Sequence, residues 1–278
     1  METTKSSIKL LFKKKLLKIF RILPVSIFEK LYLIYLNVLY GSVLRKNKDL
    51  KNKYLGKRCF FIGNGPSLKK MNLSYLANEY VFAVNYFALN KQAKIVKPDF
   101  YSVIEPCNSV YLEKEYRSLL MEINKLSISD RNLILFFNID FRNYIEEHSL
   151  FKGRKVFYLK ALLPMLESAK LYANITQPHS FMDGSPYNAF CCLSYMGFKE
   201  IYFVGCDLTL SKSGDFTHFY DYQKSTNLDN HKDWLEADSR KWHTVINFFQ
   251  KKGVKIFNAG IGGNNDYCPR SKYLSLFK

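Results

Sequence analysis

The chain has 278 residues, 47% of them hydrophobic, which is enough for one large core or for one domain with an appendage. Its formal charge is +18, but residues 1–58 hold 15 Lys or Arg against 3 Asp or Glu, a net charge of +12. Nucleic-acid binding usually needs a basic face on the folded domain itself, so this uneven charge argues against a nucleic-acid partner. Six cysteines without a Cys-x-x-Cys pair indicate buried free thiols in a reducing compartment and exclude a disulfide scaffold.

The N-terminal residues predict helices that contact a membrane surface. In residues 5–23 apolar side chains recur at helical spacing with lysines on the other face, a pattern typical of helices that lie on anionic lipid. Residues 29–40 predict a second, strongly apolar helix, for which packing on the main domain or on a partner chain is an equal alternative. No apolar run approaches the ~20 residues that span a bilayer. We therefore expect residues 5–40 to bind an anionic membrane surface, with the protein peripheral on the cytoplasmic face of the membrane.

Residues 45–58 form a basic, polar stretch that we interpret as a linker, and from Arg58 onward short apolar runs alternate with helix-like stretches. The predicted strands are Cys59–Ile62, Val81–Val84, Phe100–Ile104, Leu133–Asn138, Val156–Leu159, Ile201–Val204 and Val254–Phe257. The predicted helices lie near residues 67–78, 110–125, 141–148, 186–197 and 235–252. Continuous apolar strands separated by helices predict a mostly parallel sheet covered on both faces. The fold class is thus α/β, with one Rossmann-like domain over residues 58–278 and a helical extension over residues 1–57.

The turn after the first predicted strand is the most informative segment of the chain. It reads Gly63-Asn64-Gly65-Pro66-Ser67, and a strand, a tight turn and a helix start of this kind direct backbone N–H groups at one point, which suits a phosphate. Gly63 and Gly65 allow close approach of a ligand. The segment lacks the third glycine of the dinucleotide fingerprint and the Lys-Ser/Thr of a P-loop. An ordinary strand-to-helix turn is the alternative interpretation.

Further polar residues follow the other predicted strands, where ligands bind in parallel α/β sheets. They are Asn85, Glu105 and Asp207, to which we add the Gly184-Ser185 pair before helix 186–197 and His218 and Tyr220 in the loop after Asp207. The alternatives are a simple turn residue for Asn85, a turn cap for Asp207 and a surface histidine for His218. The histidines and carboxylates lack metal-ligand spacing, and Gly184-Ser185 lacks the G-x-S-x-G elbow of a hydrolase. We expect neither a metal nor a cofactor.

These motifs, in this order, resemble the small bacterial single-domain sialyltransferases over about residues 58–260. The resemblance is carried by Gly63-Asn64-Gly65-Pro66-Ser67-Leu68, by Asn85, by Ser185 before a helix that ends at Gly197, and by Gly205-Cys206-Asp207 followed by His218 beside aromatics. Lys97-Pro98-Asp99-Phe100 and Gly205-Cys206-Asp207-Leu208 are also similar to motifs of the related motility-associated flagellin glycosyltransferases. The same glycine motif is found in a group of pterin diphosphokinases.

The sialyltransferase resemblance implies an enzyme that transfers sialic acid or a related nonulosonic sugar from a CMP-sugar donor to a surface-glycan acceptor, with inversion and without a metal. By position, Asn64 and Ser67 would contact the phosphate and ribose, Asn85 would hold the nucleotide and Ser185 would bind near the donor carboxylate or the cytidine. His218 would be the general base, which suits an imidazole of near-neutral pKa. A lipid-linked acceptor would explain the basic extension, and a homo-oligomer is compatible with the sequence.

The sequence departs from that family at three places. Glu105 stands where the family has a polar amide, and Tyr220 lies later than the family's phosphate-binding tyrosines. Where the family has an Arg before its serine motif, the nearest candidates here are His179 and Asp183. Two other functions stay open. A Mg²⁺-dependent pterin diphosphokinase would use Glu105 and Asp207 as metal ligands, and a non-catalytic module would only bind a nucleotide sugar.

Overall fold

A computed structural model describes residues 25–104, 116–130, 132–164, 171, 173–181, 185–207, 218–220, 242–263 and 267–278. Its centre is a seven-stranded sheet in the order β5-β4-β3-β2-β1-β8-β9, in which every neighbouring pair is parallel. The strands are β1 (Arg58–Ile62), β2 (Val81–Val84), β3 (Phe100–Val103), β4 (Ile134–Asn138), β5 (Lys155–Leu159), β8 (Glu200–Val204) and β9 (Lys255–Asn258). The predicted α/β fold with a parallel sheet is confirmed.

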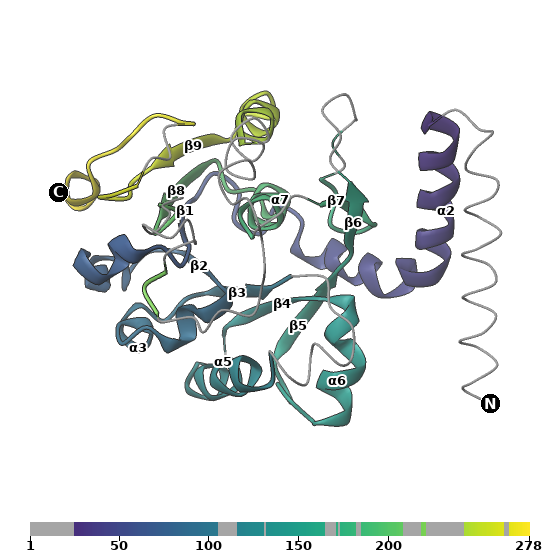
Figure 1. Ribbon diagram of the computed structural model, residues 1–278, viewed down its shortest axis with the longest axis horizontal. Helices are drawn as coiled ribbons and strands as arrows, with labels where there is room; N and C mark the ends of the chain where they lie inside the picture. The colour runs from purple at the N-terminus through teal and green to yellow at the C-terminus, as the bar shows by residue number, and fades with distance from the viewer. Residues whose placement is uncertain are drawn as a thin grey trace, which may run out of the picture.

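Both faces of the sheet are covered, because successive side chains of a strand point to opposite faces. In β1, Cys59 and Phe61 belong to one hydrophobic core, and Phe60 and Ile62 belong to another. The first core is completed by α7 (Pro186–Met196) and by helical residues 242–250. The second is completed by α3 (Ala93–Val96), α5 (Arg117–Ser129) and α6 (Arg142–Glu147). Figure 1 shows α7 above the sheet, with α3, α5 and α6 below it.

The sequence predicted the strands better than the segments between them. The helix expected near residues 67–78 is instead two 3₁₀ helices, η2 (Pro66–Lys70) and η3 (Leu73–Leu76). A second sheet of two parallel strands, β6 (Ala161–Pro164) and β7 (His179–Phe181), was not anticipated. Short 3₁₀ helices also follow β2 and β4, as η4 (Asn85–Leu89) and η6 (Ile139–Phe141).

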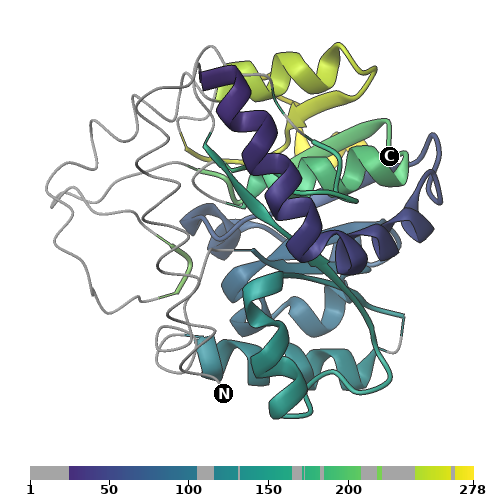
Figure 2. The same cartoon turned by 90° about the vertical axis from the view of Figure 1, so that its right-hand side faces the viewer.

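The segment before β1 packs against the domain. Helix α2 (Val25–Leu44) and η1 (Arg45–Leu50) lie beside the edge strand β5, at the opposite end of the sheet from β9 (Figures 1 and 2). The Asn47 amide is fully buried and donates to the carbonyls of Tyr158 and Ile175 over 2.8 and 2.6 Å. Residues 45–57 are therefore not a free linker, although the domain boundary drawn at residue 58 stays a prediction. The helix expected over residues 5–23 lies outside the described residues.

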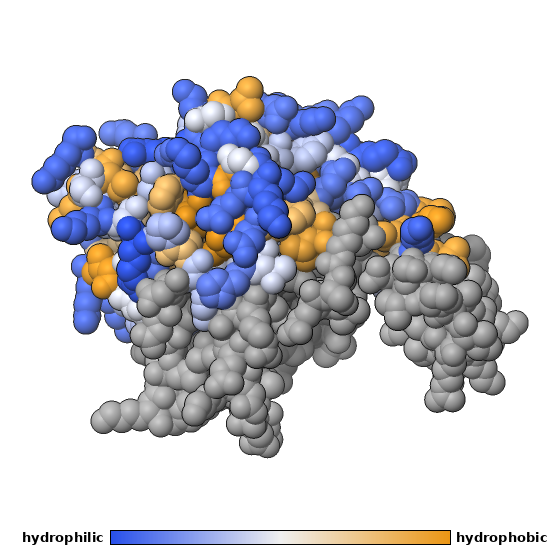
Figure 3. Space-filling view, turned by 90° about the horizontal axis from the view of Figure 1, so that it is seen from above, coloured by the Kyte–Doolittle hydropathy of each residue, from blue (hydrophilic) through white to orange (hydrophobic). Residues whose placement is uncertain are grey.

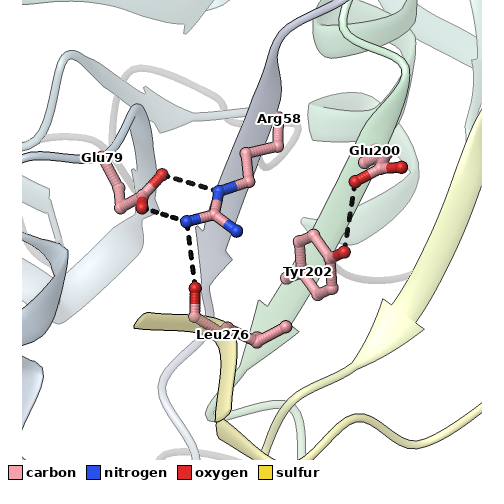
Figure 4. A network of polar contacts seen from close by, with 5 residues as sticks. All are labelled: Arg58, Glu79, Glu200, Tyr202 and Leu276. Carbon is pink, nitrogen blue, oxygen red and sulfur yellow. Dashed lines mark hydrogen bonds and ion pairs between the residues drawn. The ribbon is translucent and has the colours of Figure 1, made fainter. Parts of the chain in front are cut away.

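The C-terminal segment returns to the first strand. Arg58 forms an ion pair with Glu79 and donates a hydrogen bond of 3.2 Å to the carbonyl of Leu276 in η7 (Tyr273–Phe277), as Figure 4 shows. Arg58 and Glu200 are the first residues of β1 and β8, so this network lies at the amino ends of the strands. The candidate site lies at the opposite edge of the sheet, at the carboxyl ends of the strands.

Candidate functional site

The carboxyl ends of β2, β1 and β8 lie side by side, because these strands are neighbours in the sheet. The turn after β1 is held mainly by the end of β8. The N–H groups of Gly63 and Gly65 donate to the carbonyls of Val204 and Gly205 over 2.9 and 2.7 Å. These two amides are therefore already paired within the protein.

Ser67 is held in the same way by Asp207, which is 3% exposed. The Ser67 N–H donates to Asp207 Oδ2 over 2.7 Å, and the Ser67 hydroxyl donates to Oδ1 over 2.6 Å. The expected set of free amide donors is thus wrong for Gly63, Gly65 and Ser67, and η2, with five residues, is too short to act through a helix dipole. Contact of these residues with a ligand stays a prediction, and Asp207 positions the turn.

Glycine is required at this turn by close packing. A Cβ atom at Gly63 would lie 2.4 Å from the carbonyl oxygen of Gly205, and one at Gly65 would lie 2.4 Å from Asp207 Oδ2. Gly205 itself has φ +65°, and a Cβ atom there would lie 2.7 Å from Leu68. At Gly63 and Gly65, backbone atoms or the Asp207 carboxylate occupy the space that a side chain would fill. The turn after β1 and the turn after β8 therefore pack as one rigid unit.

A third segment joins this unit, and the sequence analysis missed it. The loop after β9 contains Gly262 and Gly263, and a Cβ atom at Gly263 would lie 2.2 Å from the backbone oxygen of Asp207. Gly263 has φ +82°, and its carbonyl accepts a hydrogen bond of 2.9 Å from Arg270. Gly260, Gly262 and Gly263 closely follow a predicted strand, and this cluster of three glycines was a sufficient signal for the loop.

Asn85, directly after β2, has a conformation that few non-glycine residues adopt. Its φ is +48°, and its carbonyl accepts a hydrogen bond of 2.6 Å from the buried Tyr101 hydroxyl. The Asn85 side-chain amide donates to Ser185 Oγ over 2.9 Å. The predicted pair of Asn85 and Ser185, 100 residues apart in the chain, is thus brought together. Strained backbone of this kind concentrates at functional sites.

The amide oxygens of Asn64 and Asn85 are buried and have no hydrogen-bond partner among the described residues. The Asn64 amide nitrogen donates to the carbonyl of Val84 over 3.3 Å, and because a carbonyl only accepts, this contact fixes Oδ1 on the other side. The partner of Asn85 is the Ser185 hydroxyl, which can donate or accept. The side-chain group of Asn85 that stays unpaired is therefore either the amide oxygen, an acceptor, or the NH2 group, a donor. A buried unpaired amide costs free energy unless a ligand pairs with it.

His218 lies next to these residues. The N–H of the following residue, Phe219, donates to the Asn64 carbonyl over 2.9 Å, and the His218 ring stacks on Tyr220 with 5.0 Å between centroids. Tyr220 in turn contacts Tyr86, with 4.7 Å between centroids. Burial lowers the pKa of His218, and a hydrogen bond with the Asn64 backbone opposes that shift. The imidazole is therefore mainly neutral near pH 7.

A second histidine, His179, is bonded to α7. It is fully buried, and its Nε2–H donates to Asn188 Oδ1 in α7 over 2.9 Å. Burial lowers its pKa to about 4, although the hydrogen bond with Asn188 raises it. His179 is therefore neutral, and it is bonded to the first turn of the helix that Ser185 precedes.

Two predicted site residues, Glu105 and Gly184, lie outside the described residues. Among the residues that are described, no group of three or more His, Cys, Asp or Glu side chains could hold a metal ion. Cys59, Cys191, Cys192, Cys206 and Cys268 are free thiols. Burial raises the pKa of Cys206, whose sulfur would lie 2.9 Å from a Cβ atom at Gly63 in the turn.

A family model described as 6-hydroxymethylpterin diphosphokinase MptE-like matches residues 35–213, more than half of the chain. The chain belongs to this MptE-like family. The matched range includes the glycine turn, Asn85, Ser185 and Asp207, and it ends before His218. A search of curated proteins gives no match to this MptE-like chain.

Among solved structures, the MptE-like chain is similar to the structure titled "MAf glycosyltransferase from Magnetospirillum magneticum AMB-1". The two are 17% identical with a TM-score of 0.51, and the match covers 84% of this chain and 38% of that chain. The chain thus spans well under half of that glycosyltransferase, and at this identity the similarity shows a shared fold.

Proposed function

We propose that this MptE-like protein is a glycosyltransferase that moves sialic acid or a related nonulosonic sugar from a CMP-sugar to a surface-glycan acceptor. The observation that carries the proposal is the placement of His218. A partly buried imidazole of lowered pKa lies beside Asn64, at the strand ends where ligands bind in such sheets. A neutral imidazole at this position can take a proton from an acceptor hydroxyl that binds within hydrogen-bond reach.

The proposed reaction is a single displacement. The acceptor hydroxyl attacks the anomeric carbon of the donor, the bond from that carbon to the CMP phosphate oxygen breaks with its electron pair going to CMP, and the hydroxyl proton goes to His218. The unpaired amide oxygen of Asn64 would accept hydrogen bonds from ribose hydroxyls or from the base, and the Asn85–Ser185 pair would bind the adjacent part of the donor. Tyr220 would orient the His218 ring by stacking.

CMP is a stable leaving group, so positioning and one base supply most of the catalysis without a metal. Asp207 contributes indirectly, because both of its oxygens hold Ser67 and thereby the turn that presents Asn64.

Mg²⁺-dependent diphosphate transfer to a pterin is the second candidate, and the family model favours it. That reaction needs carboxylate ligands for the metal. Each oxygen of Asp207 accepts one hydrogen bond from Ser67, over 2.7 and 2.6 Å, and keeps a further lone pair with which it could bind a cation. The metal dependence of the activity therefore separates the two candidates.

The test compares His218→Ala with His148→Ala, a matched change at an exposed histidine. We expect His218→Ala to lower turnover of a CMP-sugar by roughly 10²–10⁴-fold, the usual contribution of a positioned base, with CMP affinity nearly unchanged. His148→Ala should keep native turnover, and activity should persist in EDTA.

Three results would contradict the proposal. Near-native turnover of His218→Ala would place the base elsewhere. Binding of ATP with Mg²⁺ but not of CMP, together with loss of activity in EDTA, would favour the diphosphokinase. CMP binding with no turnover of any acceptor by the native protein would indicate a binding module.

A further inference from the structure

Helix α2 carries an apolar strip that faces solvent. Leu31, Ile34 and Val38 are 50%, 61% and 79% exposed, and their spacing of three and four residues places them on one side of the helix. We call these three residues the α2 strip. Leu36 and Leu44, by contrast, are 2% and 0% exposed. The helix therefore buries one side in the protein and leaves an aliphatic side uncovered.

The buried side of α2 is fixed by a charged contact. The ammonium group of Lys160, which follows β5, lies 5.1 Å from the centre of the Tyr40 ring and 2.6 Å from Asp140 Oδ1. Lys160 is 3% exposed. A buried cation with two partners holds its position. Its contact with Tyr40 therefore fixes how α2 lies on the domain, and with it the direction in which the α2 strip faces.

A basic patch continues from the end of α2. We define it as the exposed residues Arg45, Lys46, Lys48, Lys51 and Lys53. Over residues 45–53 the only acidic residue is Asp49, so the patch is strongly positive. Arg45 lies against the helix itself, since a Cβ atom at Gly41 would be 2.8 Å from Arg45 Nη1. At the α2 end of the molecule, Figure 3 shows hydrophobic and hydrophilic side chains next to one another.

We propose that the α2 strip and the basic patch dock onto an anionic lipid surface. Aliphatic side chains enter the boundary between headgroups and acyl chains, and adjacent Lys and Arg side chains bind the lipid phosphates. In the described residues no helix is long and apolar enough to cross a membrane, so α2 would lie on the surface. A symmetric dimer through the same face is disfavoured, because it would bring two copies of the basic patch together.

The apolar half of the proposal is tested with matched isoleucines. Ile34 on α2 and Ile128 on α5 are both 61% exposed, so Ile34→Gln and Ile128→Gln remove the same side chain from two surfaces. The full-length protein is mixed with vesicles of phosphatidylglycerol and phosphatidylcholine, or of phosphatidylcholine alone, and the bound fraction is measured by sedimentation. We expect binding to the anionic vesicles only, with Ile34→Gln reducing the partition coefficient about tenfold and Ile128→Gln leaving it unchanged.

The charged half is tested with the pair Lys46→Gln/Lys48→Gln against Lys91→Gln/Lys94→Gln, four lysines that are all exposed. Each cation near an anionic surface contributes roughly a fivefold factor, so the first pair should lower the partition coefficient about 25-fold and the second should not. Raising the salt concentration should weaken native binding.

Several outcomes would overturn the proposal. They are equal binding by Ile34→Gln and Ile128→Gln, equal binding to both kinds of vesicle, or a native protein that binds neither. A native dimer that dissociates in Ile34→Gln would assign the α2 strip to a second copy of the chain. Circular dichroism and thermal unfolding of each variant separate these results from loss of the fold.

Discussion

The buried His179 predicts a loss of stability in mild acid. In the folded protein burial lowers its pKa to about 4, whereas an exposed histidine in the unfolded chain has a pKa of about 6.5. Between these two values the unfolded chain binds a proton that the folded protein does not bind. The free energy of unfolding therefore decreases as the pH falls from about 6.5 toward 4, and this loss levels off below the folded-state pKa.

The size of the effect follows from the two pKa values. At pH 5 the unfolded histidine is almost fully protonated and the folded one mainly neutral, so His179 alone removes about 2 kcal/mol of stability relative to pH 8. For a domain of this size that corresponds to a decrease of roughly 4–8 °C in the unfolding temperature. The first helical turn of α7 would be affected most, because the His179 ring bonds to Asn188 there.

The assay is denaturant unfolding at pH 8 and pH 5 for the native protein and for His179→Gln, which can still donate a hydrogen bond to Asn188. Other groups titrate in the same range, so the informative quantity is the difference between the two proteins. We expect the variant to lose about 2 kcal/mol less than the native protein between the two pH values. If His179→Gln and the native protein show the same pH dependence, the histidine is not buried in the neutral form and the argument fails.

Two further substitutions test how the site is held. Gly65→Ala places a Cβ atom 2.4 Å from Asp207 Oδ2, so it should separate Ser67 from Asp207 and lower the free energy of unfolding by about 1–3 kcal/mol. As a control, the Cβ atom of Gly262→Ala would lie 3.3 Å from Ser67 Cβ, and this variant should lose less stability. Equal unfolding free energies for the two variants would contradict this packing. Tyr101→Phe removes a hydroxyl that accepts from the Ala88 N–H and donates to the Asn85 carbonyl, and should cost about 1–3 kcal/mol in thermal unfolding. A Tyr101→Phe protein as stable as native would show that Asn85 keeps its conformation without this contact.

The strands were predictable because a strand that is buried on both faces reads as a continuous run of apolar residues in the sequence. β1 reads Cys59-Phe60-Phe61-Ile62 after Arg58, and all four side chains are fully buried. The segment after Ser67 was not predictable in the same way. Its Leu68, Leu73 and Leu76 are buried at spacings that fit a helix, yet Asn72 caps a new 3₁₀ turn through a bond to Ser74 and divides the segment.

The candidate site was predictable as a list of residues and not as a set of contacts. The rule that ligands bind at strand ends placed Asn64, Asn85 and Ser185 near one another. It gave no information on which polar groups are already paired, because that depends on partners far away in the sequence. Asp207 is the clearest case, since Ser67 takes up both of its oxygens across 140 residues.

The position of β1 in the sheet also determines when the candidate site forms during folding. β1 pairs with β2, which follows closely in the chain, and with β8, which is made only after most of the chain. The contact between Ser67 and Asp207 closes a loop of 140 residues, and contacts of such long range form slowly because the entropy of the large loop is lost first. A chain that is still being synthesised therefore has the Gly63–Ser67 segment but lacks the carbonyls and the carboxylate that give it shape. The proposed donor binding would therefore need β8, and we expect shortened chains that end before β8 to lack it.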